Sequence, residues 1–523
     1  MTAATDGGAS FRLADVAAAT GGKLCSGRPD QIVSGVATDS RQVTPGQLFV
    51  ALKGSTGANG HDFVGDALRR GAAACLVEQV SFAPPTAAVV VVENCLHALA
   101  RLASWHLDRL RAAVGLRVVA VTGSVGKTST RRLCAAVLAQ DYAVLEAEGN
   151  LNTEVGVPLT CLRATAANQV VVLEFAMRGL GQIRYLAEVA RPDVGVITRI
   201  GPSHLETLGS MERIVEAKAE LVSALPPDGV AILNADDPWQ RTLPDHSRAR
   251  VVWYGRAASA AVRAEGEQDL GLGGVAFQLR IDPLRRELHL ADPRSHPTPD
   301  DTTQLPADSL LTGQMTARPA AARRVSHQST RRQVVRLRLV GSHHVENALA
   351  AAACGSVFGC AARDIARALA QVGPVHGRLQ ARDLGRILLV DDTYNANPPS
   401  MKAALQTLVQ LAPPERRVAV LADMLELGTA EESAHREVGA LAAGANLRLL
   451  VTVGSRARWI HEESLASGLP VTAAVHCPRS EFALAILAEW LEGGDTVLVK
   501  GSRGMQMEAV VAWIERWASP ESP

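Results

Sequence analysis

The sequence predicts an α/β protein of three domains: a small mixed α/β N-terminal domain, a central P-loop ATPase-like domain with a parallel sheet, and a C-terminal Rossmann-like domain. The chain has 523 residues, which is enough for about three domains. β-branched runs alternate with segments of helical period in two separate sets. A glycine-rich turn between an apolar run and a helix opens the first set.

The N-terminal domain is predicted over residues 1–113. Leu13 to Thr20 has the period of a helix, and extended runs occur at Leu48 to Leu52 and Val89 to Val92. Pro45-Gly46 indicates a turn. Short elements of both kinds predict a small mixed unit.

The central domain is predicted over residues 114–375. Its β-branched runs are separated by helical segments, an alternation typical of βαβ units on a mainly parallel sheet. The predicted strands are Val118 to Thr122, Val170 to Leu173, Val194 to Thr198 and Val230 to Leu233.

A second alternating set predicts the C-terminal domain over residues 376–523. The pattern is typical of another nucleotide-binding-like α/β unit. The predicted strands are Leu388 to Val390, Val418 to Leu421, Leu449 to Val453 and Thr496 to Val499.

Residues 291–333 interrupt this alternation of predicted strands and helices. The segment is rich in Pro, Thr, Ser, Asp and Arg and has little apolar periodicity, so it predicts a disordered insertion. The flanking strands are expected at Val275 to Ile281 and Val334 to Val340. Arginine pairs at 323/324 and 331/332 could bind an anion or a partner, but a solvated linker is favoured.

Composition argues against several function classes. Lys+Arg and Asp+Glu both number 53, and this balance argues against a polybasic nucleic-acid binder. The eight cysteines are scattered without a C-x-x-C pair, which predicts reduced core residues and disfavours a zinc site. No leader-like segment or long apolar run occurs, so we expect a cytoplasmic protein without a membrane span.

The glycine-rich turn predicts a phosphate-binding loop. Backbone N–H groups and the helix N-terminus favour an anion, Lys127 adds a positive charge, and the Thr128 hydroxyl is placed for the Mg²⁺ of a nucleotide. Position 121 is Val, where the usual P-loop has glycine, so the loop is a shortened variant. The alternative is a chance glycine-rich turn. The expected ATP- or GTP-binding residues are Gly123, Ser124, Val125, Gly126, Lys127, Thr128 and Ser129.

Polar residues also follow the neighbouring strands. Glu174 ends one strand, and His204 and Glu206 follow the next, so the three could converge on a metal near the loop, although each alone is more often structural. Lys218 lies in the helix-like Met211 to Leu225, where acidic neighbours favour a solvated helix face.

Four motifs in this order resemble the Mur ligase family. The shortened P-loop is that family's form of the motif. The Asn150-Leu151-Asn152 and Tyr394 to Pro398 stretches most resemble the members that act on D-alanyl-D-alanine. The four motifs are Thr122 to Thr128, Gly149 to Pro158, Ile197 to Ser210 and Asp391 to Pro398.

The resemblance implies an ATP-dependent amide ligation with Mg²⁺. A UDP-N-acetylmuramoyl-tripeptide would be activated as an acyl phosphate and joined to D-alanyl-D-alanine, as in peptidoglycan synthesis. Such chemistry needs alignment and charge neutralisation more than an acid or a base. The resemblance further leads us to expect a monomer.

The resemblance also implies residue roles. The catalytic set is Lys127, His204 and Lys218, and the metal set is Thr128, Glu174, His204 and Lys218, with Lys218 carbamylated. The remaining nucleotide contacts are Asn347, Arg378 and Asp392. The substrate contacts are Ser40, Arg41, Asn150, Asn152, Thr153, Tyr394 and Asn395. The chain departs from the family pattern at Arg199, Ser342 and His344.

Three alternatives remain open from the sequence. Another Mur-type ligase or a folylpolyglutamate-synthase-like ligase would share the mechanism, and a non-catalytic ATP-dependent switch would share only the loop. Because the expected site residues lie in different domains, we expect the C-terminal domain to close onto the central one about a hinge near Gly373 to Arg378.

Overall fold

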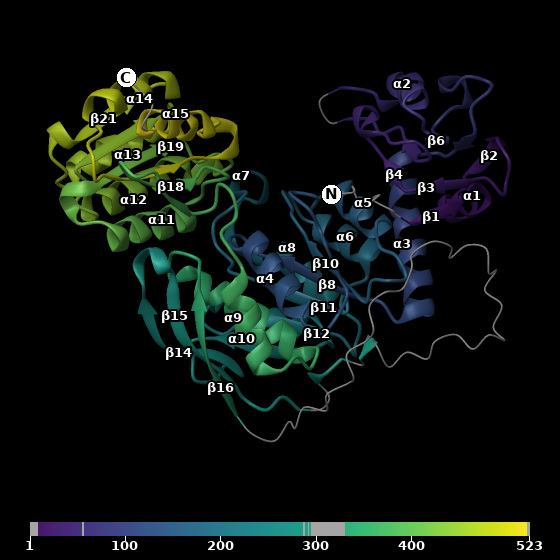
Figure 1. Cartoon of the computed structure of the whole chain (residues 1–523), viewed down its shortest axis with the longest axis horizontal. Coiled ribbons are helices and arrows are strands. Elements are labelled where there is room, and N and C mark those ends of the chain that lie inside the picture. Colours follow the sequence, from purple (N-terminus) through teal and green to yellow (C-terminus); the bar gives the residue numbers. More distant parts are fainter. Residues whose placement is uncertain (1–8, 55–56, 286–287, 291, 294–329, 520–523) are drawn as a thin grey trace.

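The computed structural model describes residues 9–54, 57–285, 288–290, 292–293 and 330–519. Three large sheets follow one another along the described part of the chain, of five, nine and six strands. The N-terminal and C-terminal parts lie at opposite ends of the molecule with the central part between them (Figure 1). The predicted three-domain α/β architecture is confirmed. We propose domain boundaries at 113/114, within the last turn of the helix Cys95–Val114, and at 375/376, between the helix Ala362–Gln371 and the strand Gln380–Asp383.

The N-terminal domain contains a five-stranded sheet of order β2-β7-β6-β5-β4 and a two-stranded ribbon, β1-β3. Its last helix, α3, packs against α1 of this domain and against α5 and α6 of the next, so it joins the two. The strands are β1 (Ser10–Arg12), β2 (Lys23–Ser26), β3 (Ile32–Ser34), β4 (Val36–Ala37), β5 (Leu48–Val50), β6 (Ala74–Val77) and β7 (Val89–Val91), and the helices are α1 (Leu13–Thr20), α2 (Val64–Arg69) and α3 (Cys95–Val114).

The central domain is built on a nine-stranded sheet of order β16-β15-β14-β13-β12-β11-β8-β10-β9. Strands β9 and β10 lie on one side of β8, and β11 and β12 lie on the other, so the winding reverses at β8, where open α/β sheets bind ligands. The strands are β8 (Arg117–Thr122), β9 (Val144–Glu146), β10 (Val170–Glu174), β11 (Val194–Ile197), β12 (Val230–Asn234), β13 (Arg250–Gly255), β14 (Val262–Asp269), β15 (Val275–Ile281) and β16 (Arg331–Leu337). The helices are α4 (Lys127–Leu138), α5 (Gly156–Leu162), α6 (Gln182–Ala190), α7 (Leu205–Leu208), α8 (Met211–Ser223), α9 (His343–Val357) and α10 (Ala362–Gln371).

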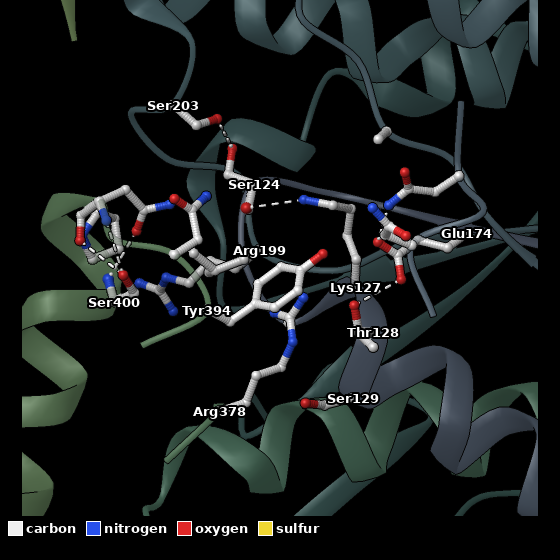
Figure 2. Close-up of a pocket in the computed structure, with 18 of the residues that line it drawn as sticks. Ser124, Lys127, Thr128, Ser129, Glu174, Arg199, Ser203, Arg378, Tyr394 and Ser400 are labelled. Atoms are coloured by element: carbon white, nitrogen blue, oxygen red, sulfur yellow. Dashed lines mark hydrogen bonds between the residues drawn. The ribbon is translucent and has the colours of Figure 1, made fainter. Parts of the chain in front are cut away.

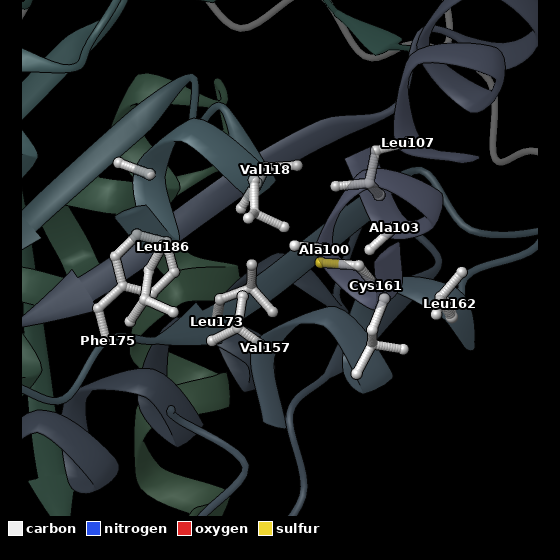
Figure 3. Close-up of a cluster of buried hydrophobic side chains, with 14 of the residues drawn as sticks. Ala100, Ala103, Leu107, Val118, Val157, Cys161, Leu162, Leu173, Phe175 and Leu186 are labelled. Carbon is white, nitrogen blue, oxygen red and sulfur yellow. The ribbon is translucent and has the colours of Figure 1, made fainter. Parts of the chain in front are cut away.

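Both faces of this sheet are covered by helices. Alternate residues of β8 face opposite sides, so Val118 and Ala120 enter one core while Val119 and Val121 enter the other. Figure 3 shows the first core, where Val118 lies among side chains from α3, α5 and β10. Helices α4, α9 and α10 cover the second face. Double coverage holds the end of β8 rigidly in place.

The C-terminal domain has a six-stranded sheet of order β17-β18-β22-β19-β20-β21, in which only β17 is antiparallel to its neighbour. The strands are β17 (Gln380–Asp383), β18 (Leu388–Asp392), β19 (Arg417–Ala422), β20 (Leu449–Val453), β21 (Ala474–Cys477) and β22 (Thr496–Lys500), and the helices are α11 (Pro398–Leu411), α12 (Glu431–Gly444), α13 (Ala457–Ala466), α14 (Ser480–Trp490) and α15 (Glu508–Ala518).

Much of the predicted insertion, and with it the arginine pair at 323/324, lies outside the described residues. The strand after it begins at Arg331, three residues earlier than predicted, because β15 and β16 pair in register as far as Ile281 and Arg331. The second arginine pair is therefore part of a strand. Strands β14, β15 and β16 are antiparallel, so one end of the mainly parallel sheet is not parallel.

Two further observations concern the chain as a whole. All eight cysteines are free thiols, and only Cys25 is exposed. Among the helices of the described ranges, none combines the length and the apolar character that crossing a membrane requires.

Candidate active site

The glycine-rich loop joins the end of β8 to the start of α4, as predicted. Gly123 has a φ of 150° and Gly126 a φ of 84°. A Cβ atom at Gly123 would lie 1.9 Å from Thr198 Oγ1, and one at Gly126 would lie 2.4 Å from Asn347 Oδ1. Both positions therefore need glycine for conformation and for close packing. Gly126 is the N-cap of the 12-residue helix α4.

We expect Gly126→Ala to destabilise the protein by about 1–3 kcal/mol more than Gly181→Ala, because overpacking adds to backbone strain. The two glycines have nearly equal φ values, 84° and 82°, but a Cβ at Gly181 would meet nothing within 4 Å. Denaturant unfolding of both variants checks this. Equal losses would mean that the contact with Asn347 is not tight.

Hydrogen bonds attach the loop to the segment that follows β11. Ser124 Oγ donates to the Gly201 carbonyl at 2.7 Å. It accepts from Ser203 Oγ at 3.0 Å (Figure 2). Thr198 Oγ1 donates to the Val125 carbonyl at 2.6 Å. The two segments therefore form one rigid wall.

Lys127 bends back over this loop. Its Nζ donates to the carbonyl oxygens of Gly123 at 3.0 Å and Ser124 at 3.2 Å (Figure 2). Part of its surface faces the cleft, yet burial of the ammonium group among protein atoms lowers its pKa, and Arg378 lowers it further. Because the partners of the Lys127 ammonium group are neutral carbonyls rather than carboxylates, its charge is available to bind a polyphosphate.

Thr128, Glu174 and Asn152 form an oxygen-rich cluster beside the loop. Thr128 Oγ1 donates to Glu174 Oε2, and Asn152 Nδ2 donates to Glu174 Oε1, both at 2.8 Å. Glu174 is 2% exposed, and Arg131 Nε lies 3.9 Å from its Oε2. A hydroxyl and a carboxylate are ligand types that Mg²⁺ prefers, so Thr128 and Glu174 fit such an ion.

His204 contacts the C-terminal domain. It lies just before α7 with a φ of 54°, and its Nδ1 lies 2.6 Å from Glu426 Oε2. The hydrogen bond from His204 lowers the pKa of Glu426. The Glu426 carbonyl also accepts from the backbone N–H of Glu206 at 3.3 Å. His204 therefore links two domains, and imidazole is an unusual ligand for Mg²⁺.

Lys218 is buried, so its helix position is not a solvated face. It is 2% exposed, and its Nζ donates to Thr122 Oγ1 at 3.4 Å. Burial, with a smaller contribution from Lys127, holds the pKa of the amine well below its usual value. An unpaired cation is costly here, which favours the neutral amine.

Asn347 joins α9 to the P-loop helix. Its Oδ1 accepts from Thr130 Oγ1 at 3.2 Å, and its Nδ2 lies 3.3 Å from His344 Nδ1. One residue earlier, Glu346 pairs with Arg199 at 3.3 Å and with Arg256 at 2.8 Å. Two of the departures from the family pattern, Arg199 and His344, therefore have partners within this wall.

Arg378 and Tyr394 approach the P-loop from the C-terminal domain (Figure 2). The guanidinium carbon of Arg378 lies 4.0 Å from the centre of the Tyr394 ring, a cation–π distance. Arg378 lies in the short connection between α10 and β17. It is therefore positioned to add positive charge near Lys127.

Asp392 is held by Lys500. Lys500 Nζ donates to Asp392 Oδ2 at 2.6 Å and to the Asn395 carbonyl at 2.8 Å, and the Leu379 N–H donates to Asp392 Oδ1 at 3.1 Å. Burial raises the pKa of Asp392, and Lys500 opposes the shift. Asp392, at the end of β18, therefore contacts both Lys500 at the end of β22 and Leu379, the residue after Arg378.

One cleft of about 2550 Å³ brings most of the predicted site together. This volume exceeds the 300–1,000 Å³ or so of a pocket for one small ligand, so more than one substrate fits. Predicted residues in its lining are Ser124, Val125, Gly126, Lys127, Thr128, Ser129, Asn150, Asn152, Thr153, Glu174, His204, Asn347, Arg378, Asp392, Tyr394 and Asn395. Gly123, Ser40, Arg41 and Lys218 do not line it.

Ser40 and Arg41 form a turn in the N-terminal domain. Asp39 accepts from the backbone N–H of Arg41 at 2.9 Å and pairs with its guanidinium at 2.8 Å. In this structure the two residues therefore belong to a short turn capped by Asp39 and lie outside the cleft lining. Lys53, which the sequence analysis did not single out, is the charged N-terminal residue in the cleft lining.

Three further residues of the site were missed by sequence reasoning. Lys500 ends β22, and its position at a strand's carboxyl end could have identified it. Arg131 lies one helical turn beyond Lys127, where a basic residue on the same face of α4 was a usable signal. Glu426 lies in a loop and carries no local signal.

Comparisons with known proteins agree with these observations. Three family models match: the Mur ligase family catalytic domain over residues 32–106, the Mur ligase middle domain over 121–291, and the Mur ligase glutamate ligase domain over 377–503. A Bacillus subtilis (strain 168) protein named UDP-N-acetylmuramoyl-tripeptide--D-alanyl-D-alanine ligase is 33% identical, over 92% of this chain and 93% of that protein.

Solved structures give the same result. MurF from Acinetobacter baumannii superposes with a TM-score of 0.79 at 27% identity, covering 98% of this chain and all of that one. MurF ligase from Thermotoga maritima in complex with ADP superposes with a TM-score of 0.73 at 26% identity, covering 92% and 97%. The predicted family resemblance is confirmed.

Proposed function

This chain belongs to the Mur ligase family, and we propose that it joins D-alanyl-D-alanine to the C-terminal carboxylate of a UDP-N-acetylmuramoyl-tripeptide with hydrolysis of ATP to ADP and phosphate. The observation that carries this proposal is the single cleft, in which the P-loop, the Asn150-to-Asn152 segment and the Tyr394 loop of a second domain face one another. The product is the pentapeptide precursor of peptidoglycan.

The reaction proceeds in two steps. The peptide carboxylate attacks the γ-phosphorus of ATP, an O–P bond forms and ADP leaves. The amine of D-alanyl-D-alanine then attacks the acyl phosphate carbonyl, and after loss of the amine proton phosphate leaves as the amide forms. Both steps move negative charge between oxygens, so positioned cations lower the barrier. Lys127 and Arg378, which both line the cleft, would supply this charge to the phosphates.

Thr128 and Glu174 would hold one Mg²⁺, which neutralises phosphate charge when bound. Asn152 and Arg131 orient the Glu174 carboxylate from two sides. His204 would reach a second ion through Nε2, because its Nδ1 faces Glu426. A carbamate on Lys218 would replace a buried neutral amine with an anion.

The two acceptor substrates are assigned to opposite walls. Asn150, Asn152 and Thr153 would contact the tripeptide, and Tyr394 and Asn395 would contact D-alanyl-D-alanine. Ser40 and Arg41 would contact the UDP moiety. The reaction would take place in the cytoplasm, where ATP is supplied, with the enzyme as a monomer.

Phosphate release tests the function directly. We expect rapid release only when ATP, a UDP-N-acetylmuramoyl-tripeptide and D-alanyl-D-alanine are all present, with a tripeptide series identifying the preferred third residue. A control with D-alanine in place of the dipeptide should give little turnover. Release that is independent of both acceptors would indicate an ATP-dependent switch, and release with a folate acceptor a different ligase.

We expect the liganded protein to be more compact than the free protein, because Arg378, Tyr394 and Lys127 lie on two domains joined by a short connection. Gly373 has no atom within 4 Å of a Cβ position and Gly377 has a φ of 68°, so the connection contains two glycines at which we expect the hinge. X-ray scattering with a non-hydrolysable ATP analogue plus the tripeptide nucleotide measures this change. An unchanged radius of gyration would contradict closure.

A further inference from the structure

Trp239 presents an aromatic face to the cleft. It lies in the turn Pro238–Gln240 after β12 and lines the cleft wall. It is 38% exposed, a large fraction for a tryptophan. Among the residues that the structure describes, no aromatic ring or guanidinium stacks on its indole. An indole uncovered in this way is an available stacking surface.

The turn that carries Trp239 is tied to the P-loop. Asp237, 2% exposed, accepts from the Trp239 N–H at 3.1 Å. Gln240, fully buried, donates to Asp237 Oδ2 at 3.0 Å and also to the Thr198 carbonyl. Thr198 in turn donates to the Val125 carbonyl of the P-loop at 2.6 Å. The backbone of the turn that carries Trp239 is therefore connected to the P-loop by hydrogen bonds.

Asn347, an expected nucleotide contact, is connected to the same wall. Val125 pairs with Arg199 through a β-bridge, and Arg199 pairs with Glu346, which precedes Asn347. Phosphates at the P-loop and a base near Asn347 would thus place the base on the wall to which Trp239 belongs.

Only two tryptophan or tyrosine side chains line the cleft among the described residues, Trp239 and Tyr394. The Tyr394 ring is already covered by Arg378 at 4.0 Å. We propose that Trp239 stacks on the purine ring of ATP and sets the affinity for the base. This inference rests on the proposed function, since it concerns the nucleotide of that reaction.

The test separates the base from the phosphates. We expect Trp239→Ala to raise the Kd for ADP roughly 10-fold in calorimetry, the scale found for removal of one base-stacking aromatic. The Kd for inorganic tripolyphosphate, which has no base, should be unchanged. Trp239→Phe keeps a ring and should retain most of the affinity. Phe482→Ala is the matched control, because Phe482 is 51% exposed and does not line the cleft.

Fluorescence gives a second readout. ADP should quench part of the tryptophan emission of the native protein, and Trp239→Phe should abolish that change while still binding ADP. Native-like ADP affinity in Trp239→Ala would overturn the stacking proposal and leave the ligase function standing. Equal loss of ADP and tripolyphosphate binding would also overturn it, since the indole would then support the loop. A native protein that binds no ADP would overturn the proposed function itself.

Discussion

Lys127→Ala is expected to lower kcat/KM by roughly 10²-fold or more, the scale of losing one preorganised charge contact to a transition state. Among the residues that the structure describes, Lys127 Nζ donates hydrogen bonds only to the carbonyls of Gly123 and Ser124. Because none of the described carboxylates accepts from it, its charge is available to pair with a phosphate. Steady-state phosphate release with all three substrates measures the effect.

The variant should remain folded. Two hydrogen bonds to carbonyls are lost, about 1 kcal/mol each, but the cost of burying an ammonium group is removed with them. Thermal unfolding distinguishes a loss of stability from a loss of catalysis. Lys23→Ala is the control, because it removes an exposed positive charge that does not line the cleft. Near-normal turnover of Lys127→Ala would remove the P-loop lysine from the mechanism.

Lys218→Ala is expected to be inactive and to regain part of its activity with added formate or acetate. The neutral amine that burial favours adds to CO₂ with loss of a proton, which makes a carbamate anion close to Lys127. A short carboxylate can occupy the space left by the truncated side chain and supply the same charge. The measurement is phosphate release across a series of carboxylic acid concentrations.

Stability distinguishes this role from a packing role. A lysine whose pKa is lowered on folding costs stability at every pH below its usual pKa, because the unfolded chain there keeps the proton. Lys218→Met should therefore be at least as stable as the native protein at neutral pH, yet inactive. A ¹³C carbamate resonance from labelled bicarbonate should appear in the native protein and be missing in Lys218→Met. Full activity of Lys218→Ala without additives would contradict the carbamate.

The local parts of this protein were determined by its sequence. Apolar β-branched runs predicted the main strands of both large sheets, because a strand covered on two faces needs apolar residues throughout. The glycine spacing and Lys127 predicted the phosphate loop, because the backbone conformation there is one that only glycine adopts freely. Glu174 was found from its position at the end of a strand next to β8.

Only the tertiary structure decided which distant groups meet. The Thr130–Asn347 bond joins residues 217 positions apart, and the Lys500–Asp392 bond spans 108. The contact of His204 with Glu426 likewise depends on how two domains sit together. Lys218 looked solvated because its helical neighbours are acidic, yet the face it occupies packs beneath β8. The periodicity of a sequence predicts on which face of a helix a residue lies. The burial of that residue, its pKa and its hydrogen-bond partner depend on which part of the protein covers the face.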